Sequence, residues 1–104
     1  MRHNAILFSR VDREDYWVTG GLVFNIKNAE SYKDAYNEVK DKLEAPDMVN
    51  YIIEDRCLLD DLFDGDETYK FKRTYWNYQL FFEFENSEGN TVEYVFSADF
   101  VKLT

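Results

Sequence analysis

The last third of the chain alternates large apolar residues with polar ones, and this pattern limits the fold more than any other feature. Residues 78–84 place Tyr, Leu, Phe and Phe at every second position, and residues 92–96 do the same with Val, Tyr and Phe. A turn-forming segment, Glu-Asn-Ser-Glu-Gly-Asn at 85–90, separates the two runs. Strict alternation is typical of strands with one buried face, so we expect an antiparallel hairpin here.

Four further segments are also predicted to be strands. Residues 68–76 alternate in the same way and place three aromatic side chains on one face, Tyr69, Phe71 and Tyr75. A short final strand over Phe100–Leu103 is a further expectation. Near the start, Ala5–Val11 and Tyr16–Ile26 are rich in β-prone residues and flank a charged turn at 12–15, which predicts a second hairpin. Gly20-Gly21 interrupts its second strand and predicts a bulge, with another tight turn as the alternative.

The middle of the chain has helical spacing. Apolar residues recur every three or four positions between Ala29 and Leu43, which predicts a helix that Asn28 or Ser31 caps and that ends before Pro46. The apolar residues of 48–63 mostly fall within one half-circle of a helical projection, so a second helix is expected between Pro46 and Gly65. The β-branched residues at 49, 52 and 53 leave a strand followed by a short helix as the alternative.

The predicted order is therefore β-β-α-α-β-β-β, an α+β domain in which an antiparallel sheet carries about two helices on one face. The 104 residues contain no repeat or linker and are 45% apolar and 18% aromatic, so residues 1–104 are expected to form one domain with a real core. The lone Cys57 cannot form an internal disulfide, and no apolar run is long enough for a signal or a membrane span. We expect a cytoplasmic protein that does not interact with membranes.

The net charge of −9 is concentrated in one stretch. Residues 47–67 contain eight acids and a single base, Arg56, while other basic residues gather near the start and at 70–73. Such a surface repels nucleic acid and anionic membrane and attracts basic proteins, so direct nucleic-acid binding is excluded first. The eight acids are Asp47, Glu54, Asp55, Asp60, Asp61, Asp64, Asp66 and Glu67.

The sequence offers few combinations of residues that are suited to catalysis. His3 is the only histidine and acids flank Cys57, which disfavours a nucleophile–base pair and leaves no ligand set for zinc. A calcium loop that starts at Asp60 would need oxygen ligands where Leu62 and Phe71 stand, so we interpret this segment as a solvated acidic turn. A carboxylate pair for glycoside hydrolysis stays open, because a sequence does not give the separation of its acids. We expect neither an enzyme nor a bound cofactor or metal.

The acidic stretch instead predicts an inhibitor. Glu54 to Glu67 holds seven acids in fourteen residues, and at a helical rise of 1.5 Å this gives one charge per ~3 Å, close to the ~3.4 Å of a DNA strand. We expect a non-enzymatic protein that mimics nucleic acid and blocks a basic, nucleic-acid-binding target, a nuclease for example. The chain is similar to the anti-restriction and anti-CRISPR proteins of phages in size and charge alone. The expected contact residues are Glu54, Asp55, Asp60, Asp61, Asp64, Asp66, Glu67 and Trp76.

Two other functional hypotheses fit the same sequence. An immunity protein or antitoxin that neutralises a cationic toxin would use the same charge, with an aromatic anchor such as Trp76 for specificity. An accessory or self-assembling domain, a homodimer for example, would use the charge only to stay in solution. Neutralisation of Asp60, Asp61 and Asp64 would distinguish these hypotheses. It should abolish partner binding by an inhibitor or an immunity protein, but not by an accessory or self-assembling domain.

Overall fold

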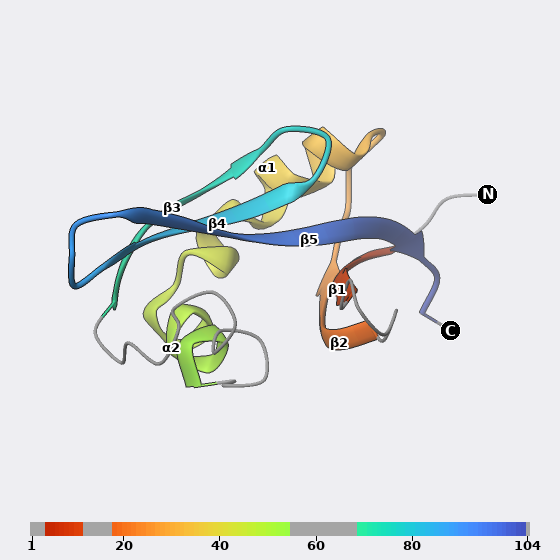
Figure 1. Cartoon of the computed structure of the whole chain (residues 1–104). Coiled ribbons are helices and arrows are strands. Elements are labelled where there is room, and N and C mark those ends of the chain that lie inside the picture. The colour runs from red at the N-terminus through yellow and green to blue at the C-terminus, as the bar shows by residue number, and fades with distance from the viewer. Residues whose placement is uncertain (1–3, 12–17, 55–68, 104) are drawn as a thin grey trace.

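The computed structural model describes residues 4–11, 18–54 and 69–103, which form an α+β fold (Figure 1). The order of elements is β-β-α-α-β-β-β, as the sequence predicts. The elements are β1 (Ala5–Val11), β2 (Val18–Asn25), α1 (Tyr32–Leu43), α2 (Pro46–Glu54), β3 (Tyr69–Trp76), β4 (Leu80–Asn86) and β5 (Thr91–Val101).

The five strands of the described residues all belong to one antiparallel, curled sheet with the order β2-β1-β5-β4-β3. The central strand β5 pairs with β4 through Thr91–Phe96 and with β1 through Ser97–Val101. The separate final strand expected at Phe100–Leu103 is therefore wrong, because β5 runs without a break to Val101. Small Ser97 and Ala98 interrupt the large side chains but keep the alternation, so Phe96, Ala98 and Phe100 share one face.

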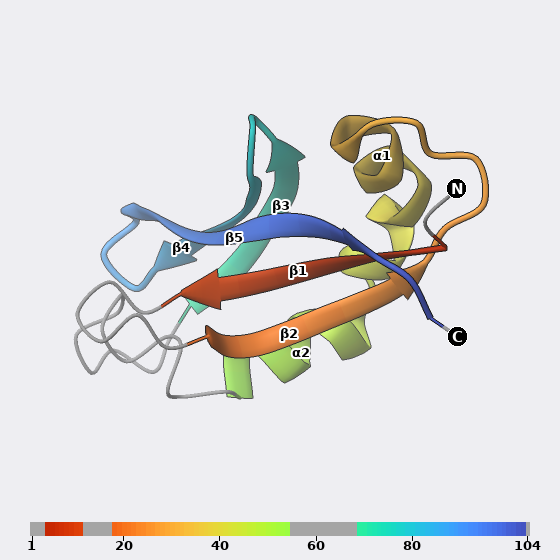
Figure 2. The same cartoon turned by 90° about the vertical axis from the view of Figure 1, so that its right-hand side faces the viewer.

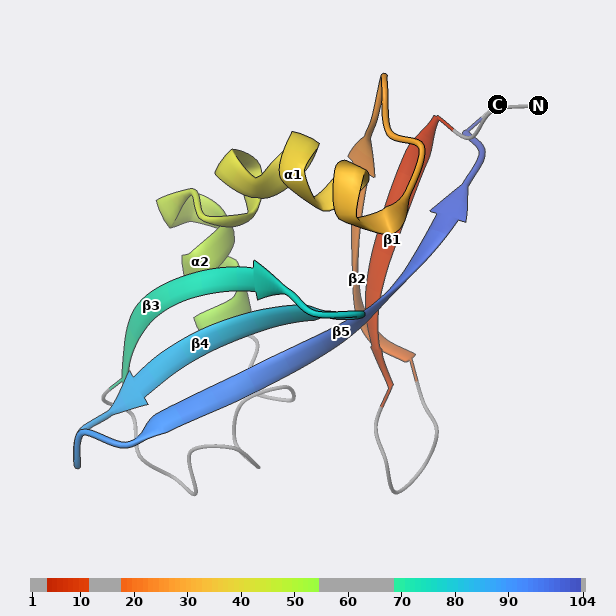
Figure 3. The same cartoon turned by 90° about the horizontal axis from the view of Figure 1, so that it is seen from above.

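Both helices lie in the concave side of this sheet (Figures 2 and 3). The alternate strand residues that point inward meet the apolar stripes of the helices and form one core. On the opposite face of the sheet, which we call the outer face, the described residues place no helix. The strand residues in the core are Ile6, Phe8, Leu22, Phe24, Leu80, Phe82, Phe84, Tyr94 and Phe96.

Helix α1 has a side-chain cap at its first turn. Of the two predicted caps the structure uses Ser31, whose hydroxyl accepts the Asp34 N–H at 3.1 Å. The Glu38 carboxylate accepts the backbone N–H groups of Lys27 and Asn28, which fixes the loop that enters the helix. The inward stripe of α1 is Ala35, Tyr36, Val39 and Leu43.

Helix α2 begins at Pro46, where a missing N–H costs no hydrogen bond. The β-branched residues at 49, 52 and 53 thus lie in a helix and not in a strand. Burial of Val49 and Ile52 in the core stabilises this helix despite the low helix propensity of β-branched residues. The described part of α2 ends at Glu54, and the expected continuation to Gly65 lies outside the described residues.

Two edge strands contain a bulge. In β2, Ser9 pairs with Gly21 and Arg10 with Thr19, so Gly20 is the extra residue and the predicted bulge is confirmed. In β3, Phe71 pairs with Phe84 and Arg73 pairs with Glu83, so Lys72 is the extra residue of a second bulge. Each bulge reverses the alternation beyond it. Tyr75 consequently lies on the outer face, and the prediction that it shares a face with Tyr69 and Phe71 is wrong.

Tyr78 forms the β3–β4 turn instead of belonging to the next strand. It adopts φ 60°, a left-handed conformation that costs a side-chain-bearing residue about 1 kcal/mol or more, and its side chain is 92% exposed. We expect Tyr78→Gly to stabilise the fold by up to about 1 kcal/mol, because glycine removes this strain. Tyr78→Ala, which removes the ring but keeps the strain, should change the unfolding free energy little. Urea denaturation of both variants tests this, and a glycine variant less stable than the alanine variant would contradict it.

Candidate protein-interaction surfaces

The predicted acidic site begins where helix α2 ends. Glu54 is the last residue of α2, and Val49 and Ile52, 6% and 0% exposed, hold this helix in the core. The core therefore fixes the point from which the acidic stretch continues. The other acids of the predicted site lie outside the described residues: Asp55, Asp60, Asp61, Asp64, Asp66 and Glu67. His3, Cys57 and the expected solvated acidic turn that starts at Asp60 also lie outside them.

Trp76, the aromatic residue of the predicted site, lies at the end of β3 on the concave side. Its ring centroid is 6.3 Å from that of Tyr36 and 6.3 Å from that of Tyr32, both on α1. Tyr32 in turn stacks on Phe100 at 4.5 Å. Trp76 thus belongs to an aromatic cluster that joins α1 to the sheet, apart from the outer face, and its role as a binding anchor stays a prediction.

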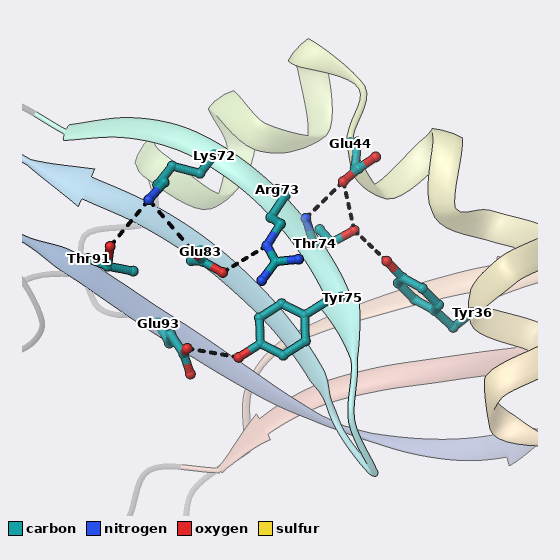
Figure 4. Close-up of polar contacts among 9 residues, drawn as sticks. All are labelled: Tyr36, Glu44, Lys72, Arg73, Thr74, Tyr75, Glu83, Thr91 and Glu93. Carbon is teal, nitrogen blue, oxygen red and sulfur yellow. Dashed lines mark hydrogen bonds and ion pairs between the residues drawn. The ribbon is translucent and has the colours of Figure 1, made fainter.

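A second candidate surface lies on the outer face, where charged and aromatic side chains of β3, β4 and β5 contact one another (Figure 4). At its centre the Glu83 side chain is only 12% exposed. Arg73 Nε donates to Glu83 Oε2 at 3.0 Å, and Lys72 Nζ lies 3.7 Å from Glu83 Oε1. Two cations therefore offset the cost of burying this carboxylate.

The same row of the sheet places two acids directly opposite each other. Glu83 on β4 pairs with Glu93 on β5, an arrangement that is destabilising unless each charge finds a partner. The Tyr75 hydroxyl donates to Glu93 at 2.8 Å, while its ring stacks on Phe81 at a centroid distance of 4.8 Å. The Arg73 guanidinium lies 4.7 Å from the centre of the Tyr75 ring. Tyr75 and Arg73 together stabilise the acidic pair.

These contacts change the acidity of Tyr75. Burial, the hydrogen bond to Glu93 and the negative charges of Glu93 and Glu83 raise the pKa of Tyr75 to about 12, although Arg73 acts in the opposite direction. The phenol therefore stays protonated, and stays a donor to Glu93, through the physiological pH range.

The raised pKa predicts a pH-dependent stability. Because the folded pKa lies above the unfolded value of 10.0, the contribution of this phenol is complete below pH 10 and is lost as the pH rises towards 12. At pH 8 the unfolding free energy of the wild type should exceed that of Tyr75→Phe by about 1 kcal/mol, the usual net contribution of an intramolecular hydrogen bond. The difference should shrink above pH 10. Urea denaturation at a series of pH values tests this, and a difference that does not vary with pH would contradict it.

Sequence reasoning missed this outer-face cluster. Tyr75 was assigned to the wrong face, and the alternation of β4 identifies Glu83 only as a solvent-facing residue. The bulge at Lys72 is what brings Arg73 opposite Glu83, and no glycine or proline marks it in the sequence. Tyr and Arg are the residue types most often found at the energetic centres of interfaces, so the outer face is chemically suited to protein contact.

The described segments show no feature of a metal site or a membrane span. Within residues 4–11, 18–54 and 69–103, no three His, Cys, Asp or Glu side chains are grouped so that they could hold a metal ion. Among the described helices, none is both long and apolar enough to cross a membrane.

Comparison of the chain with known protein families, curated proteins and solved structures gives no significant match.

Proposed function

We propose that this protein is a non-enzymatic inhibitor that binds a basic, nucleic-acid-binding protein and blocks the surface on which nucleic acid would lie. The observation that carries the proposal is the concentration of charge: residues 47–67 hold eight acids and one base in a chain of net charge −9. No bond is made or broken, because occupancy of the groove is enough to inhibit.

The fold supports this proposal because a helix packed in the core precedes residues 54–67, the part of the acidic stretch that we expect to contact the target. Helix α2 is held in the core by Val49 and Ile52, and the stretch continues from its last residue, Glu54. A charged segment that starts from a fixed point loses less conformational entropy on binding than a free tail would. Its charge would also accelerate encounter with a cationic groove, in a manner that salt weakens.

Affinity capture from a lysate of the source cells or their host tests the proposal. The full-length protein is immobilised, and the lysate is applied at low and at moderate salt, with and without excess competitor DNA. We expect one basic nucleic-acid-binding protein to be retained and to be displaced by DNA. A retained partner that DNA does not displace would contradict the nucleic-acid mimic and favour an immunity protein or antitoxin. Retention of no specific protein would contradict inhibition altogether.

A further inference from the structure

The two edges of the sheet differ in how far they are closed to further pairing. At the β3 edge, the Thr74 N–H points away from β4 and donates to the carboxylate of Glu44, at the end of α1, over 2.8 Å (Figure 4). The Thr74 hydroxyl also donates to Glu44, at 3.1 Å. This side-chain cap, the bulge at Lys72 and the basic residues of β3 are all devices that keep an edge strand from pairing.

The β2 edge lacks such a cap in the described structure. The Ile26 N–H donates to the Asn4 carbonyl at 3.0 Å, which makes Ala5 and Asn25 a pair without mutual hydrogen bonds. By alternation, the N–H and C=O groups of Gly21, Val23 and Asn25 point away from β1. Among residues 4–11, 18–54 and 69–103, no group accepts from or donates to them.

The composition of β2 also leaves this edge open. Its eight residues, Val-Thr-Gly-Gly-Leu-Val-Phe-Asn, contain no charge and no proline, although 32% of the whole chain is charged. Val23 lies at the middle of the set of three residues Gly21, Val23 and Asn25, and it is 52% exposed. The bulge at Gly20 limits the regular edge to residues 21–25, a stretch long enough for three outward-pointing residues.

We propose that β2 pairs with β2 of a second copy of this chain, so that the two sheets become one continuous antiparallel sheet. The outward set is symmetric about Val23. A two-fold axis there places Val23 opposite the same residue of the other copy and Gly21 opposite its Asn25. Because the symmetry generates the Gly21–Asn25 pair twice, three pairs form, and each exchanges two backbone hydrogen bonds. The segment brings no like charges together, and an uncharged strand is its own complement.

The charge of the chain gives this dimer a distinctive response to salt. Two copies that each carry −9 repel one another, so screening should strengthen the β2–β2 pair. Binding of a basic target through the acidic stretch has the opposite salt dependence, so the two interactions can be distinguished in one titration.

Sedimentation equilibrium of the full chain, at low and at moderate salt, tests the proposal with three variants of Val23. Val23→Thr keeps a β-branched, uncharged residue and should dimerise like wild type. Val23→Lys and Val23→Glu each place like charges face to face and should raise the dimer dissociation constant about ten-fold or more. An equimolar mixture of the two should restore dimers. Circular dichroism of each variant confirms that it is folded.

Hydrogen exchange of the wild type gives an independent measurement that needs no variant. We expect the amides of Gly21, Val23 and Asn25 to exchange more slowly as the protein concentration rises, with the amides of Leu22 and Phe24, which bond to β1, as internal reference. A chain that stays monomeric at millimolar concentration would overturn the proposal. Dimers that both charged variants leave unchanged would also overturn it, as would a lysine variant that dimerises more tightly than wild type.

Discussion

Replacement of Asp60, Asp61 and Asp64 by asparagine is expected to weaken capture of the basic partner by about 100-fold while it leaves the unfolding free energy unchanged. Charges that face an oppositely charged partner act mainly on the rate of association and contribute little to the fold. Surface plasmon resonance against the captured partner should show a slower association, and the salt dependence of that rate should be less steep than for wild type.

A matched variant separates the position of the charge from its amount. Glu30, Asp41 and Glu88 are exposed acids outside the acidic stretch, and their replacement by glutamine, asparagine and glutamine changes the net charge by the same three units. We expect this control to bind nearly as well as wild type. Equal weakening by both triple variants would show that total charge, and not residues 60–64, determines binding.

The largest loss of stability is expected from Phe82→Ala, at about 3–5 kcal/mol. Phe82 is fully buried at the middle of β4, and its ring lies 5.5 Å from that of Phe96 and 6.3 Å from that of Phe71. Its removal leaves a cavity that three strands line. Since domains of this size are stable by only about 5–15 kcal/mol, chemical denaturation should show a large drop in the midpoint.

Phe81 provides the control for this substitution, because it immediately precedes Phe82 in the chain and its side chain lies on the opposite face. It is partly exposed and stacks on Tyr75. Phe81→Ala should therefore cost about 1 kcal/mol, near the contribution of one aromatic pair. Equal losses for the two variants would contradict the assignment of inner and outer faces in β4.

The alternation and spacing of the sequence predicted most of the fold, because they report directly which side of an element is buried. The helical stripe that ends at Leu43 was predicted for this reason, while the bulge in β2 was predicted from the Gly20-Gly21 pair that interrupts the strand. The predictions failed where the backbone departs from a regular period. The bulge at Lys72 moved Tyr75 to the other face, and the left-handed turn at Tyr78 removed that residue from β4.

The interactions of single polar side chains with distant backbone were beyond sequence reasoning. Glu44 caps Thr74 thirty residues away, and the Asn4 amide donates to and accepts from the Leu103 backbone at 2.8 and 2.7 Å. Neither contact leaves a periodic signal, since each depends on where two elements meet. The acidic stretch is the reverse case, because its charge is visible in the sequence and needs no fold to be recognised.

The position of β5 determines the order in which this chain can fold. The central strand β5 is the last of the described strands in the sequence. Its pairing with β1 therefore joins residues that are about ninety positions apart in the chain. The β1–β2 and β4–β5 hairpins are local and can form early, but closure of the β1–β5 ladder waits for a long loop to close. We therefore expect slow folding whose rate-limiting step is the meeting of the two hairpins.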